Sequence, residues 1–446
     1  MITTSSINHT PASAVGAGSW RYYRRRPDSL AAAPLEVVLR FCMITTFYPP
    51  HHFGGDAIAI RRLCHGLVRA GHQVEVICDV DAWRTLSDGE EPLPLEEPEG
   101  LTVHRLRSRL PSVAALMTHQ LGRPTVHRRR IEQIVEAGRF DVINFHNVSL
   151  VGGPGLLSVG GPDVVKLYMA HEHWLVCPTH VLWRHGREAC PSRECLRCTA
   201  HHRRPPQLWR STGALGRALD HVHEFLAISQ FSADKHREFG FPKPMTVLPY
   251  GLPDREDGEV AGGAAHSRPY FLYVGRLEAI KGLDDVIPAM AGYPDADLLI
   301  AGSGSHEDAL RAAGEGLDNV HFLGWVESAR LRSYYRDCLA LIVPSVCFET
   351  FGIILAEAFR DGTPVIARDI GPFPELIATA QGGELFSTPA ELLSAMGRMQ
   401  QDEGLRRRQG VSARAAWEAN WSEAVVIPAY LQIARRVRRR LNGSAT

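Results

Sequence analysis

Residues 340–374, ALIVPSVCFETFGIILAEAFRDGTPVIARDIGPFP, decide the fold of this chain. The apolar run 341–343 is typical of a buried parallel strand. Helical periodicity follows over 353–358, which predicts a helix packed on that strand. Gly362 then ends the helix before a second apolar run at 365–366. The stretch therefore predicts a strand, a loop, a helix and a strand, which together are the repeating unit of a parallel α/β sheet.

Two carboxylates and a glycine mark the loop and helix of this unit. Glu349 lies in the loop, and Glu357 follows eight positions later on the helix. Eight residues are about two helical turns, so both side chains can face one crevice. Phe351, Gly352 and Ile353 lie where the helix begins. A helix N-terminus with a glycine that admits close approach suits phosphate or sugar oxygens.

The string Pro-Ser-x3-Glu-x-Phe-Gly-x4-Glu-Ala, followed by Gly-x-Pro-Val-Ile-Ala, resembles the E-x7-E signature of retaining glycosyltransferases of family four. The resemblance implies a nucleotide-sugar donor and the α/β GT-B fold, with two Rossmann-like doubly wound domains facing across a cleft. In that family the first Glu faces the donor sugar, which would be Glu349 here. The second holds the ribose hydroxyls, which would be Glu357.

Length and charge limit the remaining interpretations. A chain of 446 residues suits two domains of roughly 200 residues each. Lys and Arg together number 49, as do Asp and Glu, so no net field favours nucleic acid as a partner.

The opening MITTSSINHT is polar and lacks the apolar core of a signal peptide, and no apolar run reaches the eighteen or so residues of a bilayer span. We expect a cytoplasmic protein.

Composition and the resemblance together predict the domain boundaries. The basic cluster at 21–26 is read first as a solvated charge run, and the one at 435–440 as favouring the dipole of its helix. Both could also touch anionic lipid, which would bring the protein to the inner face of the membrane. The predicted segments are a disordered arm at 1–34, an N-terminal acceptor-side Rossmann-like domain at 35–250 with a Cys-rich insert at 177–206, a linker at 251–268, a C-terminal nucleotide-sugar-binding Rossmann-like domain at 269–415, and a C-terminal helix at 416–446 that crosses back to the first domain.

The N-terminal domain opens with a strand, a glycine loop and a helix. The predicted strand 36–44 leads to Gly54 and Gly55, and the predicted helix spans 56–70. In a doubly wound sheet, ligands bind beyond the carboxyl ends of the strands, so the two glycines face the crevice. The loop is not a G-x-G-x-x-G dinucleotide motif. It resembles the family loop whose backbone approaches the donor phosphate and the acceptor.

His171 follows the predicted strand 164–169 directly, in Ala-His-Glu-His-Trp. The family has a histidine at this position that contacts the donor sugar and the reacting centre, and the resemblance gives His171 that role. Glu172 and His173 stand where the family has Asp and an aromatic residue. Tyr250 likewise stands where Asn is usual, so the hydrogen bonding around His171 departs from the family pattern.

The C-terminal domain begins with the strand 270–274 and the motif Gly-Arg-Leu-x3-Lys-Gly, which places two cations, Arg276 and Lys281, beyond the end of a strand. The motif resembles that of the family, in which these charges neutralise the leaving diphosphate. The strand and loop 321–326 resemble the family segment that contacts the base through backbone groups, with Val326 as the candidate residue.

The Cys-rich insert contains the spacing C-x12-C-x4-C-x2-C, formed by Cys177, Cys190, Cys195 and Cys198. In a cytosolic protein this spacing favours a tetrahedral thiolate site, most simply structural zinc, over disulfides. Four thiolates would leave zinc no open position for a substrate. Unpaired cysteines in a loop and an iron–sulfur cluster are the alternatives.

The resemblance implies transfer with retention at the anomeric carbon and no cofactor for catalysis. Arg276, Lys281 and helix dipoles take the place of a catalytic metal, so we discount the Asp-x-Asp pair at 79–81 as a GT-A metal motif. The donor would be a UDP- or GDP-linked hexose, and the acceptor a polysaccharide, a lipid-linked sugar or a small molecule. A sugar-nucleotide epimerase and an inactive scaffold that binds sugar nucleotides are the alternatives. A pyridoxal-phosphate phosphorylase would need a Schiff-base lysine, and the candidate, Lys281, lies in a phosphate motif.

Overall fold

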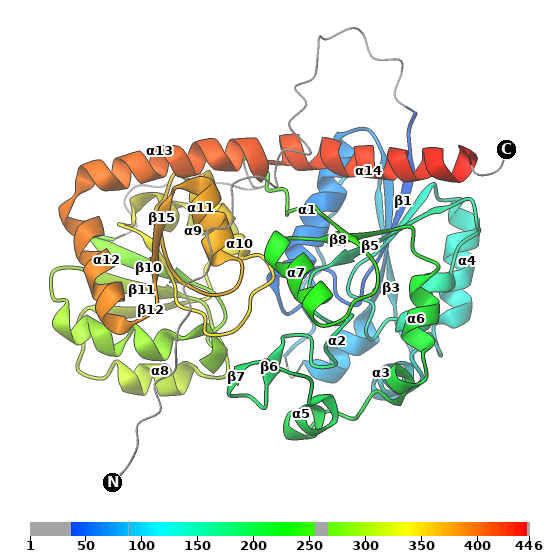
Figure 1. The fold of residues 1–446 in the computed structure, drawn as a ribbon, viewed down its shortest axis with the longest axis horizontal. Coiled ribbons are helices and arrows are strands. Elements are labelled where there is room, and N and C mark those ends of the chain that lie inside the picture. Colours follow the sequence, from blue (N-terminus) through cyan, green and yellow to red (C-terminus); the bar gives the residue numbers. More distant parts are fainter. Residues whose placement is uncertain (1–36, 88, 255–265, 444–446) are drawn as a thin grey trace, which may run out of the picture. The chain divides into compact units, whose positions relative to one another are not determined.

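Two parallel sheets with helices on their faces form the part of the chain that the computed structural model describes, residues 37–87, 89–254 and 266–443 (Figure 1). Residues 38–446 group as one unit by their contacts. The predicted arm at 1–34 and most of the predicted linker at 251–268 lie outside the described residues.

The first sheet has the strand order β3-β2-β1-β4-β5-β8-β9, and all its neighbouring strands run parallel. The order turns back between β1 and β4, so the loops after these two strands flank the switch point where such sheets bind ligands. Its strands are β1 (Arg40–Ile44), β2 (Gln73–Asp79), β3 (Leu101–Leu106), β4 (Val142–Phe145), β5 (Val165–Ala170), β8 (Glu224–Ala227) and β9 (Met245–Val247).

Helices cover both faces of this sheet, which is why β4 and β5 are buried along their whole length. The helices are α1 (Gly55–Arg69), α2 (Val80–Leu86), α3 (Pro111–Leu121), α4 (Arg128–Gly138), α6 (Ala214–Leu219) and α7 (Gln230–Glu238). The Cys-rich insert adds the hairpin β6 (Trp183–Arg184) and β7 (Glu188–Ala189) and the short helix α5 (Cys195–His201).

The second sheet repeats the same plan, with the order β12-β11-β10-β13-β14-β15 and a switch point between β10 and β13. Its strands are β10 (Tyr270–Val274), β11 (Asp297–Ala301), β12 (Val320–Gly324), β13 (Leu341–Val343), β14 (Val365–Arg368) and β15 (Gly383–Phe386). Its helices are α8 (Glu307–Ala313), α9 (Ser328–Asp337), α10 (Ile353–Arg360), α11 (Phe373–Ala380), α12 (Pro389–Gln401) and α13 (Glu403–Asn420). The predicted α/β class with two Rossmann-like doubly wound sheets is confirmed.

The segment 416–446, predicted as one helix, is divided by a break at 421–422, and its first residues belong to α13. The helix after the break, α14 (Glu423–Gly443), lies along the first sheet (Figure 1). Gly66 of α1 admits Ile427 so closely that a Cβ there would lie 2.6 Å from its side chain. The Tyr430 hydroxyl accepts a hydrogen bond from Asn144 at 3.0 Å.

Three arginines in the basic cluster near the end of α14 pair with carboxylates of the first sheet. Arg436 and Arg440 both bond Glu224, at 3.0 and 2.7 Å, and Arg438 lies 3.1 Å from Asp141. Three of the arginines in this cluster, which the sequence analysis considered as a membrane contact, therefore form ion pairs within the protein.

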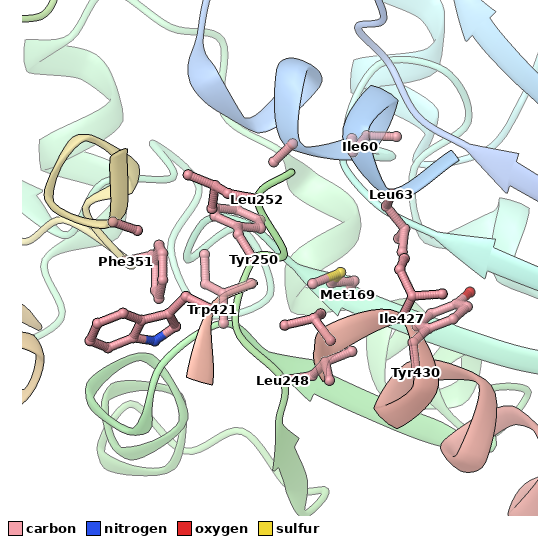
Figure 2. Packing of buried hydrophobic residues seen from close by; sticks show 14 of the residues in the cluster. Ile60, Leu63, Met169, Leu248, Tyr250, Leu252, Phe351, Trp421, Ile427 and Tyr430 are labelled. Carbon is pink, nitrogen blue, oxygen red and sulfur yellow. The ribbon is translucent and has the colours of Figure 1, made fainter. Parts of the chain in front are cut away.

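One continuous apolar cluster includes residues of both sheets and the strand exit at 248–252 (Figure 2). Phe351 lies beside Tyr250, with the two rings edge to face and 5.2 Å between their centroids. The Leu252 N–H bonds the Trp421 carbonyl at 2.8 Å. This packing fixes the loop that carries Phe351 against the end of the first sheet.

Candidate active site

Lys281 and Glu349 form an ion pair beyond the carboxyl ends of β10 and β13. Lys281 ends a short 3-10 segment (Ala279–Lys281), and Glu349 lies in the loop between β13 and α10. The Lys281 ammonium bonds Glu349 Oε1, and the Ser345 hydroxyl donates to the same oxygen at 3.1 Å. The two charged side chains are 19% and 25% exposed, so they are sheltered yet open to a ligand.

The pair keeps both groups charged although each is partly desolvated. Burial alone would lower the pKa of Lys281, but the nearby Glu349 carboxylate outweighs it and raises that pKa above its ordinary value. Burial would likewise raise the pKa of Glu349, and the Lys281 charge outweighs it and lowers that pKa. At neutral pH the site therefore presents a cation and an anion in contact.

Gly282 sets the position of Lys281. Its φ is +73°, and a Cβ built there would lie 2.2 Å from the carbonyl oxygen of Pro344. The Val346 N–H also donates to the Ile280 carbonyl at 3.0 Å. The lysine loop and the loop after β13 are thus in backbone contact, which only glycine permits at this point.

Arg276 follows β10 in the same region. Its side chain is 52% exposed, and its guanidinium bonds Glu278 at 2.5 Å. Its charge acts on Glu349 in the same direction as that of Lys281, though more weakly, and lowers the pKa of that carboxyl. Gly302 lets the next loop pack closely, because a Cβ there would lie 1.9 Å from the Gly275 carbonyl oxygen.

Two helix N-termini meet in the structure. Gly54 and Gly55 open α1, and Gly352, with a φ of +91°, precedes Ile353 at the start of α10. A Cβ on Gly55 would lie 3.4 Å from Ile353 Cγ2. The two glycine loops that the sequence assigned to the donor are therefore neighbours, and each presents N–H groups without partners within its own helix.

His171 is 6% exposed, and both of its ring nitrogens are engaged by the protein. Nδ1 lies 2.7 Å from the Tyr250 hydroxyl, and Nε2 lies 2.7 Å from Nδ1 of His146. Burial lowers the pKa of His171 to about 4, so the ring is neutral at physiological pH. The His171 side chain faces Tyr250 and His146. The backbone carbonyl of His171, in contrast, contacts the neighbouring loop.

That carbonyl links the histidine loop to the glutamate loop. The Thr350 hydroxyl donates to the His171 carbonyl at 2.8 Å, and the Ser229 hydroxyl donates to the Thr350 carbonyl at 2.6 Å. The Ser229 oxygen also accepts from the Ser232 N–H, which caps α7. The residue after Glu349 is thereby tied to the ends of β5 and β8 of the first sheet.

Glu357 has different partners from Glu349. One oxygen accepts a bond from Arg62 of α1 at 2.9 Å, and the other accepts from the Tyr335 hydroxyl at 3.2 Å. The side chains of Arg62 and Glu357 are only 10% and 14% exposed. This carboxylate therefore joins α10 to α1.

The remaining predicted residues lie further from this cluster. Val326 follows β12 and is half-buried against the apolar cluster. Asp79 caps α2 through the Ala82 N–H at 3.1 Å, and Asp81 bonds the His127 ring at 2.9 Å. Both carboxylates of the Asp-x-Asp pair therefore make hydrogen bonds within the first domain.

Two clusters in the described part of the chain bring three ligand-type side chains within 4.8 Å of one another. The first is the buried group of Asp79, Asp81 and His127, and the second is His266, Asp297 and His321. The second group lies where β11 and β12 begin, which is the opposite edge of the sheet from Lys281.

Sequence reasoning missed several residues that shape the site: His146, Arg62, Ser345 and Thr350. His146 directly follows the buried strand β4 at the switch point, and a polar residue there is a signal that could have found it. Arg62 gives no such signal, because a charged residue in the middle of a helix is usually a solvated one.

Two family profiles match adjoining parts of the chain. "Glycosyltransferase Family 4" matches residues 53–256, and "Glycosyl transferases group 1" matches residues 254–416. Together they cover the second sheet, the first sheet except β1, and every predicted donor-site residue. The chain belongs to the family-four glycosyltransferases. It is therefore an enzyme of the class that transfers a sugar from a nucleotide sugar to an acceptor.

Individual relatives agree with this assignment. A phosphatidyl-myo-inositol mannosyltransferase of Mycolicibacterium smegmatis is 25% identical over 344 residues, covering 74% of this chain and 77% of the relative. A sucrose-phosphate synthase from Thermosynechococcus elongatus has a similar fold, with a TM-score of 0.66 at 19% identity over 90% of this chain and 99% of that one. The Anabaena protein HepE, solved with UDP, gives a TM-score of 0.61 at 17% identity, over 89% of this chain and all of that one.

Proposed function

We propose that this enzyme moves a hexosyl group from a UDP- or GDP-linked sugar to its acceptor with retention of the anomeric configuration and without a catalytic metal. The observation that carries the proposal is the contact of Lys281 with Glu349, beside Arg276, at the carboxyl ends of β10 and β13. It combines a cationic site that suits a diphosphate with an anion in contact with it.

The diphosphate is the group whose negative charge grows as the sugar leaves. Lys281 and Arg276 stabilise that charge, and the N–H groups at the starts of α1 and α10 add to the effect. A cation already held in place by Glu349 costs no reorganisation when the reaction occurs. These groups perform the work that a divalent metal performs in other transferases.

Glu349 provides the complementary negative charge. Its oxygen Oε1 is bonded to Lys281 and Ser345, which fixes the orientation of the carboxylate. It acts by position, holding the sugar and stabilising positive charge at the anomeric carbon. The leaving phosphate oxygen takes the acceptor proton on the face that the phosphate leaves, which gives retention.

His171 and Glu357 support this arrangement. The neutral His171 positions the loop of Glu349 through its backbone carbonyl, which accepts a hydrogen bond from the Thr350 hydroxyl. Glu357 binds the ribose hydroxyls with the oxygens that Arg62 and Tyr335 orient. Val326 contacts the base through its backbone.

The donor and acceptor classes rest on the family and its relatives. The Mycolicibacterium relative is named for mannosyl transfer to a phosphoinositide, and HepE was solved with UDP. The acceptor we propose is a polysaccharide, a lipid-linked sugar or a small molecule, met in the cytoplasm or at the inner face of the membrane. None of the described helices has the length and apolar character of a bilayer span.

A panel of UDP-, GDP- and ADP-sugars tests the proposal. Donor binding is measured by calorimetry, nucleoside diphosphate release is measured with candidate acceptors, and the anomeric configuration of the product is read by NMR. We expect one donor to bind, and to lose its binding in Lys281→Ala. An inverted product would exclude the mechanism, and interconversion of the sugar without acceptor would show an epimerase.

A further inference from the structure

The start of α7 supports the loop that carries Glu349. Phe348 and Thr350, the residues on either side of Glu349, both contact it. The centroid of the Phe348 ring lies 5.3 Å from that of Phe231, and the Thr350 carbonyl accepts the hydrogen bond of the Ser229 hydroxyl at 2.6 Å. Because α7 belongs to the domain of the first sheet and this loop to the domain of the second, the position of Glu349 depends on where α7 begins.

Glu375 of the second domain holds the start of α7. It lies in the first turn of α11, and its two carboxylate oxygens accept bonds from the N–H groups of Gln230 and Phe231, each at 3.0 Å. These are the first two residues of α7, and N–H groups at that position have no partner within their own helix. The Ser229 hydroxyl accepts a third bond, from the Ser232 N–H at 2.9 Å. The start of α7 is thus capped by both domains.

A carboxylate suits this position. The N–H groups and the dipole at the start of a helix favour negative charge. Burial raises the pKa of Glu375 above its ordinary value, and the bonds from Gln230 and Phe231 oppose that rise. Separating the two domains would leave the Glu375 oxygens and both N–H groups without these partners. The contact therefore favours the arrangement in which the domains are together.

Glu349 is held from both domains in different ways. Lys281 and Ser345, both of the second domain, bond its carboxylate. The residues before and after it rest instead on the start of α7, which belongs to the first domain. Glu349 therefore has its full set of contacts only while the two domains are together.

We propose that Glu375 is a positioning residue for Glu349: it holds the start of α7 against the second domain and so makes the placement of Glu349 depend on the approach of the two domains. The proposal rests on the role proposed above for Glu349, and it adds that a contact between the domains controls that role. Closure of this kind completes a catalytic arrangement only after the substrate has entered.

Hydrogen exchange tests the contact itself, without donor or acceptor. The amide hydrogens of Gln230 and Phe231 should exchange at least about ten-fold faster in Glu375→Ala than in wild type, read by mass spectrometry of overlapping peptides. Glu391→Ala is the matched control. Glu391 also bonds a backbone N–H, that of Ser387 at 2.7 Å, but at the start of α12, so exchange at α7 should not change. Equal exchange in wild type and Glu375→Ala would overturn the proposal.

Steady-state kinetics test the link to Glu349. Glu375→Ala should lower kcat about 10–100-fold and change the donor KM little, because a misplacement of about 1 Å can cost a catalytic group that much. Glu375→Gln keeps one oxygen that can accept an N–H bond, so it should lose less. Glu391→Ala should keep the wild-type kcat. A donor KM that rises while kcat stays at the wild-type value would contradict a positioning role.

A double-mutant cycle on kcat separates positioning from a general loss of stability. Ser229→Ala removes the bond to the Thr350 carbonyl. If Glu375 acts through the start of α7, Glu375→Ala should cost less in the Ser229→Ala background than in wild type. Losses that multiply would overturn the proposal.

The Glu349→Gln variant distinguishes this inference from the proposed function. Near-native turnover in Glu349→Gln would overturn the proposed function and this inference with it. Wild-type kcat in Glu375→Ala, beside an inactive Glu349→Gln, would overturn this inference alone.

Discussion

Lys281 and Glu349 are 68 residues apart in the chain and share one ion pair at the carboxyl edge of the second sheet. We predict that Lys281→Ala and Glu349→Gln each lower turnover by about two orders of magnitude or more. Each change removes one preorganised charge from a site where charge develops in the reaction. Nucleoside diphosphate release at matched donor and acceptor concentrations measures the effect, and circular dichroism checks the fold.

Lys243→Ala is the matched control for this prediction. Lys243 also forms an ion pair, with Asp220 at 2.7 Å, but the pair is exposed and lies far along the first sheet. We expect wild-type turnover from this variant. Near-native activity in both Lys281→Ala and Glu349→Gln would remove these residues from the site.

Tyr250→Phe should lower turnover while leaving the fold intact. The change keeps the ring against Phe351 and removes the hydroxyl that bonds His171 at 2.7 Å. A buried group left without its partner costs about 1–3 kcal/mol, which Tyr250→Phe should show as lower stability in urea. His171 then keeps only the contact of its Nε2 with His146, so the residue whose backbone carbonyl accepts the Thr350 bond is held less firmly.

Tyr430→Phe separates the two effects. It also removes a buried hydroxyl, which Asn144 bonds at 3.0 Å, but on α14 away from the glutamate loop. We expect a similar loss of stability with unchanged turnover. If both variants lose turnover equally, the Tyr250 effect is one of stability alone.

The stability of the protein should fall as the pH drops from about 6.5 toward about 4, in part through His171. Burial lowers the pKa of this ring in the folded protein to about 4, whereas the unfolded chain binds its proton below the ordinary value of 6.5. In that window the unfolded state holds more protons, so the free energy of unfolding decreases with falling pH. Above the window His171 is neutral in both states and contributes no pH dependence.

Urea unfolding of wild type and His171→Gln at about pH 7.5 and about pH 5 measures this contribution. One group contributes at most about 1.4 kcal/mol per pH unit within its window. The variant should therefore lose less stability than wild type between the two conditions. An equal loss in both would show that the His171 pKa is not depressed.

The strand, loop and helix around Glu349 could be predicted because their signals are local. The apolar run of β13, the glycine before α10 and the stop at Gly362 all lie within 22 residues, and each acts through backbone conformation or burial. The doubly wound order of both sheets follows from the same alternation of strands and helices. The C-terminal helix differs from prediction, because the predicted segment 416–446 is divided between α13 and α14.

The contacts that complete the site could not be predicted in the same way. Tyr250 and His171 are 79 residues apart, and Arg62 and Glu357 are 295 residues apart. Whether such side chains meet depends on how the helices pack, which no local pattern encodes. The sequence marked Tyr250 only as a departure from the family, and the structure gives the reason: its ring packs on Phe351 and its hydroxyl engages His171.

Gly282→Ala should lower both stability and turnover. The residue has a φ of +73°, and the new Cβ would lie 2.2 Å from the Pro344 carbonyl oxygen. A positive φ alone costs alanine about 1–2 kcal/mol, and the clash adds to this by moving the lysine loop away from β13. Thermal unfolding and the donor turnover of the same preparation measure the two effects.

Gly316→Ala is the control for Gly282→Ala. Gly316 has a similar φ of +81°, but a Cβ there meets no atom within 4 Å. This variant should show the cost of the backbone conformation without the loss of turnover. Equal turnover in the two variants would show that Lys281 keeps its place when its loop shifts.

Arg62 and Glu357 should be coupled in stability, and Glu357 alone should be coupled to the donor. The pair lies at 2.9 Å with both side chains largely buried, so a double-mutant cycle of Arg62→Met and Glu357→Gln should give an interaction free energy of about 1–3 kcal/mol in urea unfolding. If Glu357 binds the ribose in the ground state and the transition state alike, Glu357→Gln raises the donor KM more than it lowers kcat. Arg62→Met leaves the carboxylate in place and frees one oxygen, so its effect on KM should be smaller. The opposite order, with the arginine variant binding donor more weakly, would mean that Arg62 itself contacts the nucleotide and that Glu357 serves only to hold it.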